Sequence, residues 1–123
     1  MCKAAVVTDL GIVTEEVLSA VRGAHLLVAE SNHDEELLRS GPYPYPLKAR
    51  ILSDHGHLSN LSCAALCAEA EAWGARRIVL AHLSKENNTP SLAWKTVSAA
   101  LSSDLPVTVA PRDAVGPTYP VER

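Results

Sequence analysis

The chain has 123 residues, of which 47% are hydrophobic and 20% are charged, and it contains no Phe. This length supports one hydrophobic core rather than two, and the composition excludes a disordered chain. The net charge is −3 without a Lys/Arg cluster, which argues against an autonomous nucleic-acid-binding domain. No apolar run approaches the ~20 residues that cross a bilayer, and no signal peptide is evident. We therefore expect a cytoplasmic protein with one domain, residues 1–110, and a flexible tail, residues 111–123.

The first part of the chain predicts two strands with a helix between them. Residues 4–8 form a short β-prone run. Thr14 is suited to cap a helix that ends at Gly23. Residues 25–30 are a continuous apolar run of strand length, which is typical of a buried strand.

The middle of the chain predicts a short helix, an extended connection and a long helix. Residues 34–39 suit the short helix, and the three prolines of residues 42–46 favour an extended surface connection. Ser59 or Asn60 can cap the long helix, which ends at Gly74.

The last part predicts a strand at residues 77–83, a helix that Pro90 opens, and a strand at residues 107–110. The complete order is β-α-β-α-loop-α-β-α-β. This order favours an α/β fold in which one sheet is covered by helices.

Candidate chemical residues lie at the ends of the predicted strands. Asp9 and His82 each end a strand, and open α/β sheets bind ligands outside the carboxyl ends of their strands. Each also has a structural explanation, as a turn former and as a hydrogen-bonded core residue. Glu30 closes another strand and needs a partner if it is buried, for which His57 is the natural candidate. Such a pair either orients a proton donor or ties a loop to the sheet.

Further polar residues lie close to these positions in the sequence. His33 and Asp34 are possible additional site residues, although His33 also suits a loop or a helix cap. Residues 85–87 form a polar loop after His82 that can line a substrate groove or simply face solvent.

The segment that precedes the long helix is a poor metal motif. Residues 55–57 begin like the metallo-hydrolase motif H-x-H-x-D-H, but Ser59 and Asn60 replace its Asp and His. Asn60 is therefore either a cap residue or an additional site residue. Cys63 and Cys67 share a helix face, and we interpret them as buried apolar residues rather than as metal ligands.

Five segments in order resemble the YycJ-type branch of the metallo-β-lactamase superfamily. They read TDLG, AESNHD, YPLKARILSD, GHLSN and LAHLSKENN, and begin at residues 8, 29, 45, 56 and 80. Each motif alone is weak, but their order makes the match specific.

The resemblance implies that this chain is the C-terminal half of an αββα sandwich. The family enzymes are expected to be exonucleases that cleave phosphodiester bonds of DNA with two divalent metal ions, Zn²⁺ or Mn²⁺. By this resemblance, Asp9 bridges the two metals and His82 is the last histidine ligand. Glu30 and His57 correspond to the pair beside the scissile phosphate, where the imidazole acts as general acid. His33 corresponds to a residue typical of this branch.

The family's H-x-H-x-D-H half has no counterpart in this sequence. Two ligands are too few for a dinuclear site, so we expect the chain alone to bind metal weakly or not at all and to be inactive. We also expect the inner sheet face to be uncovered and to pair with a second copy, as a homodimer, or with a complementing N-terminal half.

Two other functions are compatible with the sequence. A non-catalytic scaffold or interaction domain would keep the fold as a dimer without metal. A small doubly wound binding domain would have the same element order, but no Gly-x-Gly-x-x-Gly motif or phosphate loop follows the first predicted strand.

Overall fold

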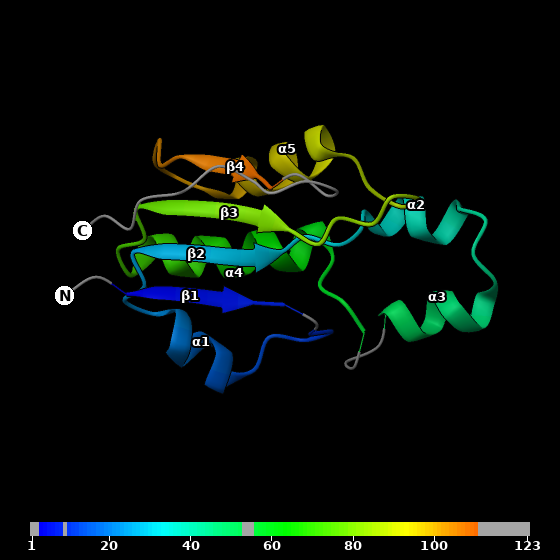
Figure 1. Cartoon of the computed structure of the whole chain (residues 1–123), viewed down its shortest axis with the longest axis horizontal. Coiled ribbons are helices and arrows are strands. Elements are labelled where there is room, and N and C mark those ends of the chain that lie inside the picture. The colour runs from blue at the N-terminus through cyan, green and yellow to red at the C-terminus, as the bar shows by residue number, and fades with distance from the viewer. Residues whose placement is uncertain (1–2, 9, 53–55, 111–123) are drawn as a thin grey trace.

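A four-stranded parallel sheet forms the centre of the protein (Figure 1). The computed structural model describes residues 3–8, 10–52 and 56–110. The elements follow one another as β1 (Ala4–Val7), α1 (Glu15–Val21), β2 (Leu26–Glu30), α2 (Glu35–Ser40), α3 (Tyr45–Leu52), α4 (Asn60–Ala72), β3 (Arg77–Ala81), α5 (Pro90–Ala100) and β4 (Val107–Val109).

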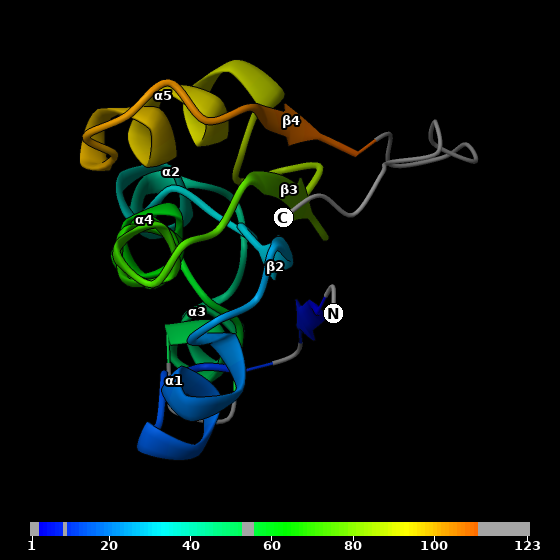
Figure 2. The same cartoon turned by 90° about the vertical axis from the view of Figure 1, so that its left-hand side faces the viewer.

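The strands lie in the sheet in the same order as in the chain, β1-β2-β3-β4. Each strand pairs in parallel with the next, and β2 and β3 pair along their full length, from Leu26 opposite Arg77 to Glu30 opposite Ala81. When every crossover advances in one direction with the same hand, the helices fall on one face. Figure 2 shows α1, α4 and α5 on the same side of the sheet.

The core lies between the sheet and these helices. Leu27, Ile78 and Leu80 point from the two central strands toward α4 and α5, and none is accessible to solvent. Leu66 of α4 and Val97 of α5 pack against them, and both are also buried. Complete burial of such a side chain stabilises a fold by about 1.5–3 kcal/mol, so this face of the sheet determines how the helices dock.

The helix starts confirm the predicted caps at Thr14 and Ser59 and add two that the sequence analysis did not name, at Asp34 and Thr89. Thr14, Asp34, Ser59 and Thr89 each lie one residue before a helix, and each side chain accepts a hydrogen bond from the backbone N–H three residues later. Gly23 follows α1 with a φ of 83°, a conformation that residues with a Cβ atom rarely adopt.

The prediction that residues 42–46 are an extended connection is wrong at its C-terminal end. Helix α3 begins at Tyr45 and contains Pro46 as its second residue. Proline is tolerated in the first helical turn, because the backbone N–H groups there have no intrahelical acceptor. Helices α2 and α3 lie beyond the C-terminal ends of the strands, where they can line a site (Figure 1).

A second correction concerns the end of β3. The strand ends at Ala81 rather than at residue 83, and His82 follows with a φ of 56°. This left-handed conformation is uncommon for a residue with a side chain and often occurs at functional sites.

The opposite face of the sheet carries no helix among the residues that the structure describes. Val6 of β1 lies on this face and is 68% exposed, whereas Val79 of β3 is buried. Pairing of this face with another chain stays a prediction, as does the boundary at residue 110. The expected tail, residues 111–123, lies outside the described residues. None of the described helices is long and apolar enough to span a membrane.

Candidate active site

A buried carboxylate joins two imidazole rings at the C-terminal edge of the sheet. The side chain of Glu30 is inaccessible to solvent. Its Oε2 accepts hydrogen bonds from Nδ1 of His57 at 2.9 Å and from the backbone N–H of Leu58 at 3.2 Å. Its Oε1 lies 3.3 Å from Nδ1 of His82. The carboxylate therefore accepts two hydrogen bonds on Oε2 and has an imidazole nitrogen next to Oε1, which compensates for its burial.

Three separate segments of the chain bring these side chains together. Glu30 is the last residue of β2, and the register places it opposite Ala81, the residue before His82. His57 lies in the segment that connects α3 to α4. Both imidazoles are partly exposed, with side-chain accessibilities of 37% for His57 and 52% for His82. The buried carboxylate thus presents two accessible rings to solvent.

Backbone hydrogen bonds hold the same three segments in register. Asn32 donates its backbone N–H to Leu58 O at 2.9 Å and accepts from Ser84 N at 2.7 Å. Asn60 N donates to His33 O at 2.8 Å. These bonds extend the parallel pairing beyond the strand ends, so the positions of the imidazoles are determined by main chain as well as by side chains.

A pair of buried side-chain amides supports the segments that carry the site. Asn60, the first residue of α4, and Asn88, just before α5, exchange two hydrogen bonds of 2.9 Å between their side-chain amides. Asn88 Nδ2 also donates to Ser31 O at 2.9 Å, and the Ser31 hydroxyl donates to Asn60 Oδ1 at 2.5 Å. Asn60 is therefore a supporting residue in the structure, and Asn88 is a partner that the sequence did not single out.

His33 lies beside the cluster but is buried. Asn32 Nδ2 donates to the His82 carbonyl at 2.9 Å, so its Oδ1 is the acceptor that faces His33 Nδ1 at 3.2 Å. His33 therefore carries its proton on Nδ1. Burial lowers the pKa of His33 below its ordinary value. His33 and His57 both border a cavity of about 160 Å³.

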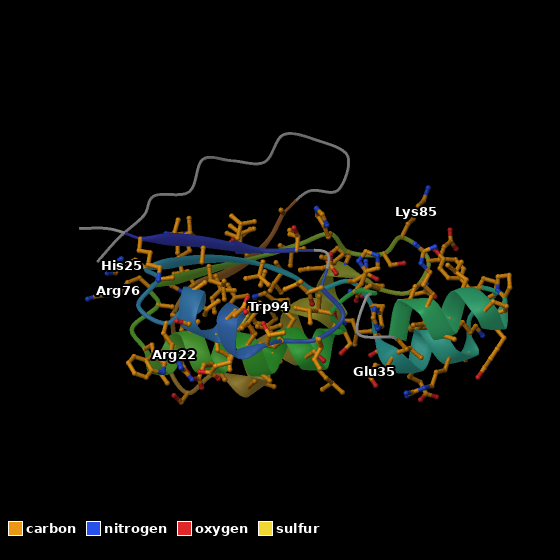
Figure 3. The ribbon with its side chains drawn as sticks, turned by 90° about the horizontal axis from the view of Figure 1, so that it is seen from below. Arg22, His25, Glu35, Arg76, Lys85 and Trp94 are labelled. Carbon is orange, nitrogen blue, oxygen red and sulfur yellow. The ribbon has the colours of Figure 1, made fainter. Side chains whose placement is uncertain are left out.

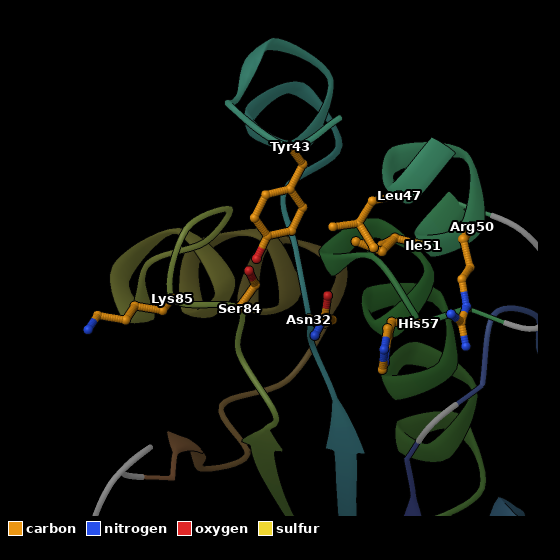
Figure 4. A pocket seen from close by; sticks show the side chains of 9 residues that line it. Asn32, Tyr43, Leu47, Arg50, Ile51, His57, Ser84 and Lys85 are labelled. Carbon is orange, nitrogen blue, oxygen red and sulfur yellow. The ribbon is translucent and has the colours of Figure 1, made fainter. Parts of the chain in front are cut away.

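His57 also lines a larger pocket of about 410 Å³. Asn32, Ser84 and Lys85 line it from the strand-end loops, and Tyr43, Leu47, Arg50 and Ile51 line it from α3 and the segment before it (Figure 4). Lys85 lies at the C-terminal end of the sheet, and His25 and Arg76 lie at the opposite end (Figure 3). Of the loop after His82, Lys85 lines this pocket, and a role of that loop in binding substrate stays a prediction.

The remaining sequence candidates have other positions. Asp9 and His55 lie outside the described residues. Asp34 caps α2, where Oδ1 accepts from Leu37 N at 3.0 Å. Asn87 is buried rather than solvent-facing.

The two central cysteines lie together in α4. Cys63 and Cys67 are both buried, with their sulfur atoms 3.9 Å apart. Their mutual hydrogen bond and their burial raise the pKa of Cys67 well above its ordinary value. A neutral thiol agrees with the prediction of a packing role.

Sequence reasoning missed two parts of the site. It paired Glu30 with His57 but not with His82, although both strands end at the same edge. It also treated Tyr43 and the helix after it as a connection, because the prolines there obscured a helix whose residues Leu47 and Ile51 recur at a spacing of four.

The cluster of Glu30, His57 and His82 is suited to support a metal ligand rather than to chelate a metal by itself. In the part of the chain that the structure describes, no group of three or more His, Cys, Asp and Glu side chains could hold a metal ion. A histidine that binds metal typically has its second ring nitrogen on a carboxylate, and Glu30 stands in this relation to His82.

Comparisons with known proteins agree with this architecture. No protein-family model matches the sequence. The chain is 44% identical over 99 residues to the exodeoxyribonuclease YycJ of Bacillus anthracis, which covers 80% of this chain and 38% of the relative. It is 45% identical over 103 residues to the exodeoxyribonuclease WalJ of Streptococcus pneumoniae, which covers 83% of this chain and 38% of the relative. The chain thus spans only 38% of the length of these relatives.

A solved structure shares the fold. The metallo-β-lactamase fold protein YhfI from Bacillus subtilis superposes with a TM-score of 0.54 and 18% sequence identity, covering 89% of this chain and 34% of YhfI. Together with the YycJ and WalJ matches, this likeness identifies the chain as part of a metallo-β-lactamase fold of the YycJ type.

Proposed function

We propose that this chain supplies the proton-transfer part of a metal-dependent exonuclease that hydrolyses phosphodiester bonds in DNA. The observation that carries the proposal is the binding of both His57 and His82 to the single buried carboxylate of Glu30. The similarity to two exodeoxyribonucleases supports DNA as the substrate. A cytoplasmic location is part of the same proposal.

His57 is the proton donor in this proposal. Its Nδ1 is held by Glu30, so Nε2 is directed away from the carboxylate and toward the accessible side of the ring. A protonated imidazole in this orientation can deliver a proton to the oxygen that leaves the scissile phosphate. Glu30 positions the ring and stabilises its positive charge, and it transfers no proton to substrate itself.

His82 and Asp9 are the proposed metal ligands. With Nδ1 of His82 against Glu30, Nε2 is the nitrogen oriented for a metal. Bound divalent metals, Zn²⁺ or Mn²⁺, would supply an activated water and neutralise phosphate charge. The two ligands do not complete a two-metal centre, so the remaining ligands must come from a complementing N-terminal half. We infer that the present chain is catalytically inactive when it is alone.

Reconstitution tests this function. The chain is incubated with end-labelled DNA and Mn²⁺ or Zn²⁺, alone and together with a polypeptide that carries an H-x-H-x-D-H half. Activity is expected only in the mixture, and His57→Ala and Glu30→Ala should each lower it by two orders of magnitude or more. His25→Gln is the matched control, because His25 lies at the opposite end of the sheet. A clear rate from the pure chain that Asp9→Ala abolishes would contradict the inferred inactivity.

A second candidate is a non-catalytic scaffold that self-associates through the sheet. The exposed Val6 on the helix-free face favours it. Metal titration separates the two candidates, since a scaffold binds neither Zn²⁺ nor Mn²⁺ near stoichiometry even in the mixture.

A further inference from the structure

The pocket beside His57 has one apolar side that is shaped by α3. The Tyr43 ring hangs from the segment before α3 with its hydroxyl end directed toward Ser84, and Leu47 and Ile51 of α3 lie to one side of the ring (Figure 4). Tyr43 is only partly buried, so its ring remains open to a ligand. An aromatic ring next to aliphatic side chains is a suitable surface for a flat, weakly polar group.

The same pocket carries positive charge in a chain whose net charge is negative. Arg50 and Lys85 line it, and none of its lining residues is Asp or Glu among the residues that the structure describes, although the whole chain has a net charge of −3. The Arg50 side chain lies on the same side of the pocket as His57, and Lys85 extends outward from the rim (Figure 4). A ligand with one apolar end and one anionic end matches this distribution.

We propose that this pocket binds the terminal nucleotide of a single DNA strand, with its base against Tyr43 and its phosphate toward His57 and Arg50. The volume of about 410 Å³ falls within the usual range of small-ligand pockets, about 300–1,000 Å³. The proposal rests on the proposed nuclease function, because it places the phosphate beside the imidazole that donates the proton.

Two substrate preferences follow from the character of the walls. A base can reach Tyr43 only after it leaves the helical stack, so a single-stranded end is bound more tightly than a blunt duplex end. Stacking and aliphatic contact do not distinguish the four bases, because every base has a π-face. The pocket therefore selects an unpaired end and tolerates any base there.

Binding without turnover tests this proposal on the complete 123-residue chain. A fluorescently labelled single-stranded oligodeoxynucleotide is titrated in the presence of a chelator, and anisotropy gives the Kd. Tyr43→Ala is expected to raise the Kd roughly tenfold, the order of effect of losing one stacked base. Tyr43→Phe should bind like the unchanged chain. Tyr45→Ala is the matched control, because Tyr45 is a tyrosine two residues from Tyr43, is 81% exposed and does not line the pocket.

The charged rim has its own test. Lys85→Ala should reduce the slope of log Kd against log salt concentration by about one, as expected for the loss of one phosphate contact. Lys95→Ala, which changes an exposed lysine of α5, should leave that slope unchanged. Circular dichroism of every variant confirms that the fold is retained.

The possible outcomes separate this proposal from the proposed function. Loss of binding in Tyr43→Ala with no cleavage in any reconstituted mixture keeps the pocket assignment and rejects the nuclease. Cleavage that Tyr43→Ala leaves unchanged, equal weakening by Tyr45→Ala, or the absence of measurable binding to the unchanged chain overturns the pocket assignment.

Discussion

His57 and His82 are held by the same carboxylate through the same ring nitrogen. Nδ1 of His57 lies 2.9 Å from Glu30 Oε2, and Nδ1 of His82 lies 3.3 Å from Glu30 Oε1. Because a carboxylate only accepts hydrogen bonds, both neutral rings are expected to carry their proton on Nδ1. The two rings are thus oriented alike, and a change in Glu30 affects both.

The first prediction concerns Glu30→Gln. The new amide has one accepting oxygen and one donating nitrogen, so one of the two rings should change to the Nε2–H tautomer to keep its contact. ¹⁵N NMR of the imidazole nitrogens measures this directly. We expect a destabilisation of about 1–2 kcal/mol for the rearranged bonds. Unchanged Nδ1–H tautomers in both rings would falsify the shared-carboxylate arrangement.

The second prediction concerns pH and His33. Burial lowers the pKa of His33 in the folded protein below its ordinary value of 6.5. The unfolded chain therefore binds a proton first as the pH falls, so this contribution to stability is present above pH 6.5 and decreases as the pH falls toward the folded-state pKa. Chemical denaturation across this range should give a smaller dependence on pH for His33→Gln than for the unchanged chain. Equal slopes would show that His33 is not the group responsible.

The third prediction concerns the buried amide pair. Asn88→Ala removes the partner of Asn60 and leaves the Ser31 carbonyl without its side-chain donor. Each buried polar group without a partner costs about 1–3 kcal/mol, so the total for the two groups should be about 2–6 kcal/mol. The double variant Asn60→Ala, Asn88→Ala should lose less than the sum of the single changes, because the two residues interact directly. Additive losses in urea denaturation would argue against the pair.

The fourth prediction concerns the open face of the sheet. If the chain associates with a second copy there, Val6→Lys should shift it to monomer in sedimentation velocity runs, since a charged side chain is costly in an apolar interface. Leu61→Lys is the matched control, as Leu61 is 63% exposed and lies on α4 rather than on the sheet. A monomer for the unchanged chain at micromolar concentration would refute self-association.

Local sequence signals predicted most of the elements. The caps at Thr14 and Ser59 and the apolar runs of β2 and β3 depend on residues close to one another in the chain, so they could be identified without knowledge of the fold. Helix α3 was missed because a proline near a helix start can indicate either the end of helical structure or its first turn. A proline in the interior of a helix breaks the helix, whereas a proline in the first turn is tolerated. Which effect applies depends on where the helix starts.

The pairing of Glu30 with His57 could be anticipated, because a carboxylate at the end of an apolar strand needs a donor and few candidates exist. The contact between Glu30 and His82 depends on the strand order, and the pocket that Tyr43 lines depends on where α3 lies. Both are long-range properties that no short segment of sequence contains.

The sequence alone determined that the chain is an α/β unit, which residues could carry chemistry, and which family it resembles. Periodicity, helix caps and motif order can all be identified from the order of residues, without knowledge of the fold. Only the tertiary structure decided that one carboxylate serves two imidazoles and that an aromatic, positively charged pocket adjoins one of them. The physical reason is that hydrogen-bond partners are selected by distance in space, and the parallel register of β2 and β3 sets that distance for residues far apart in the chain.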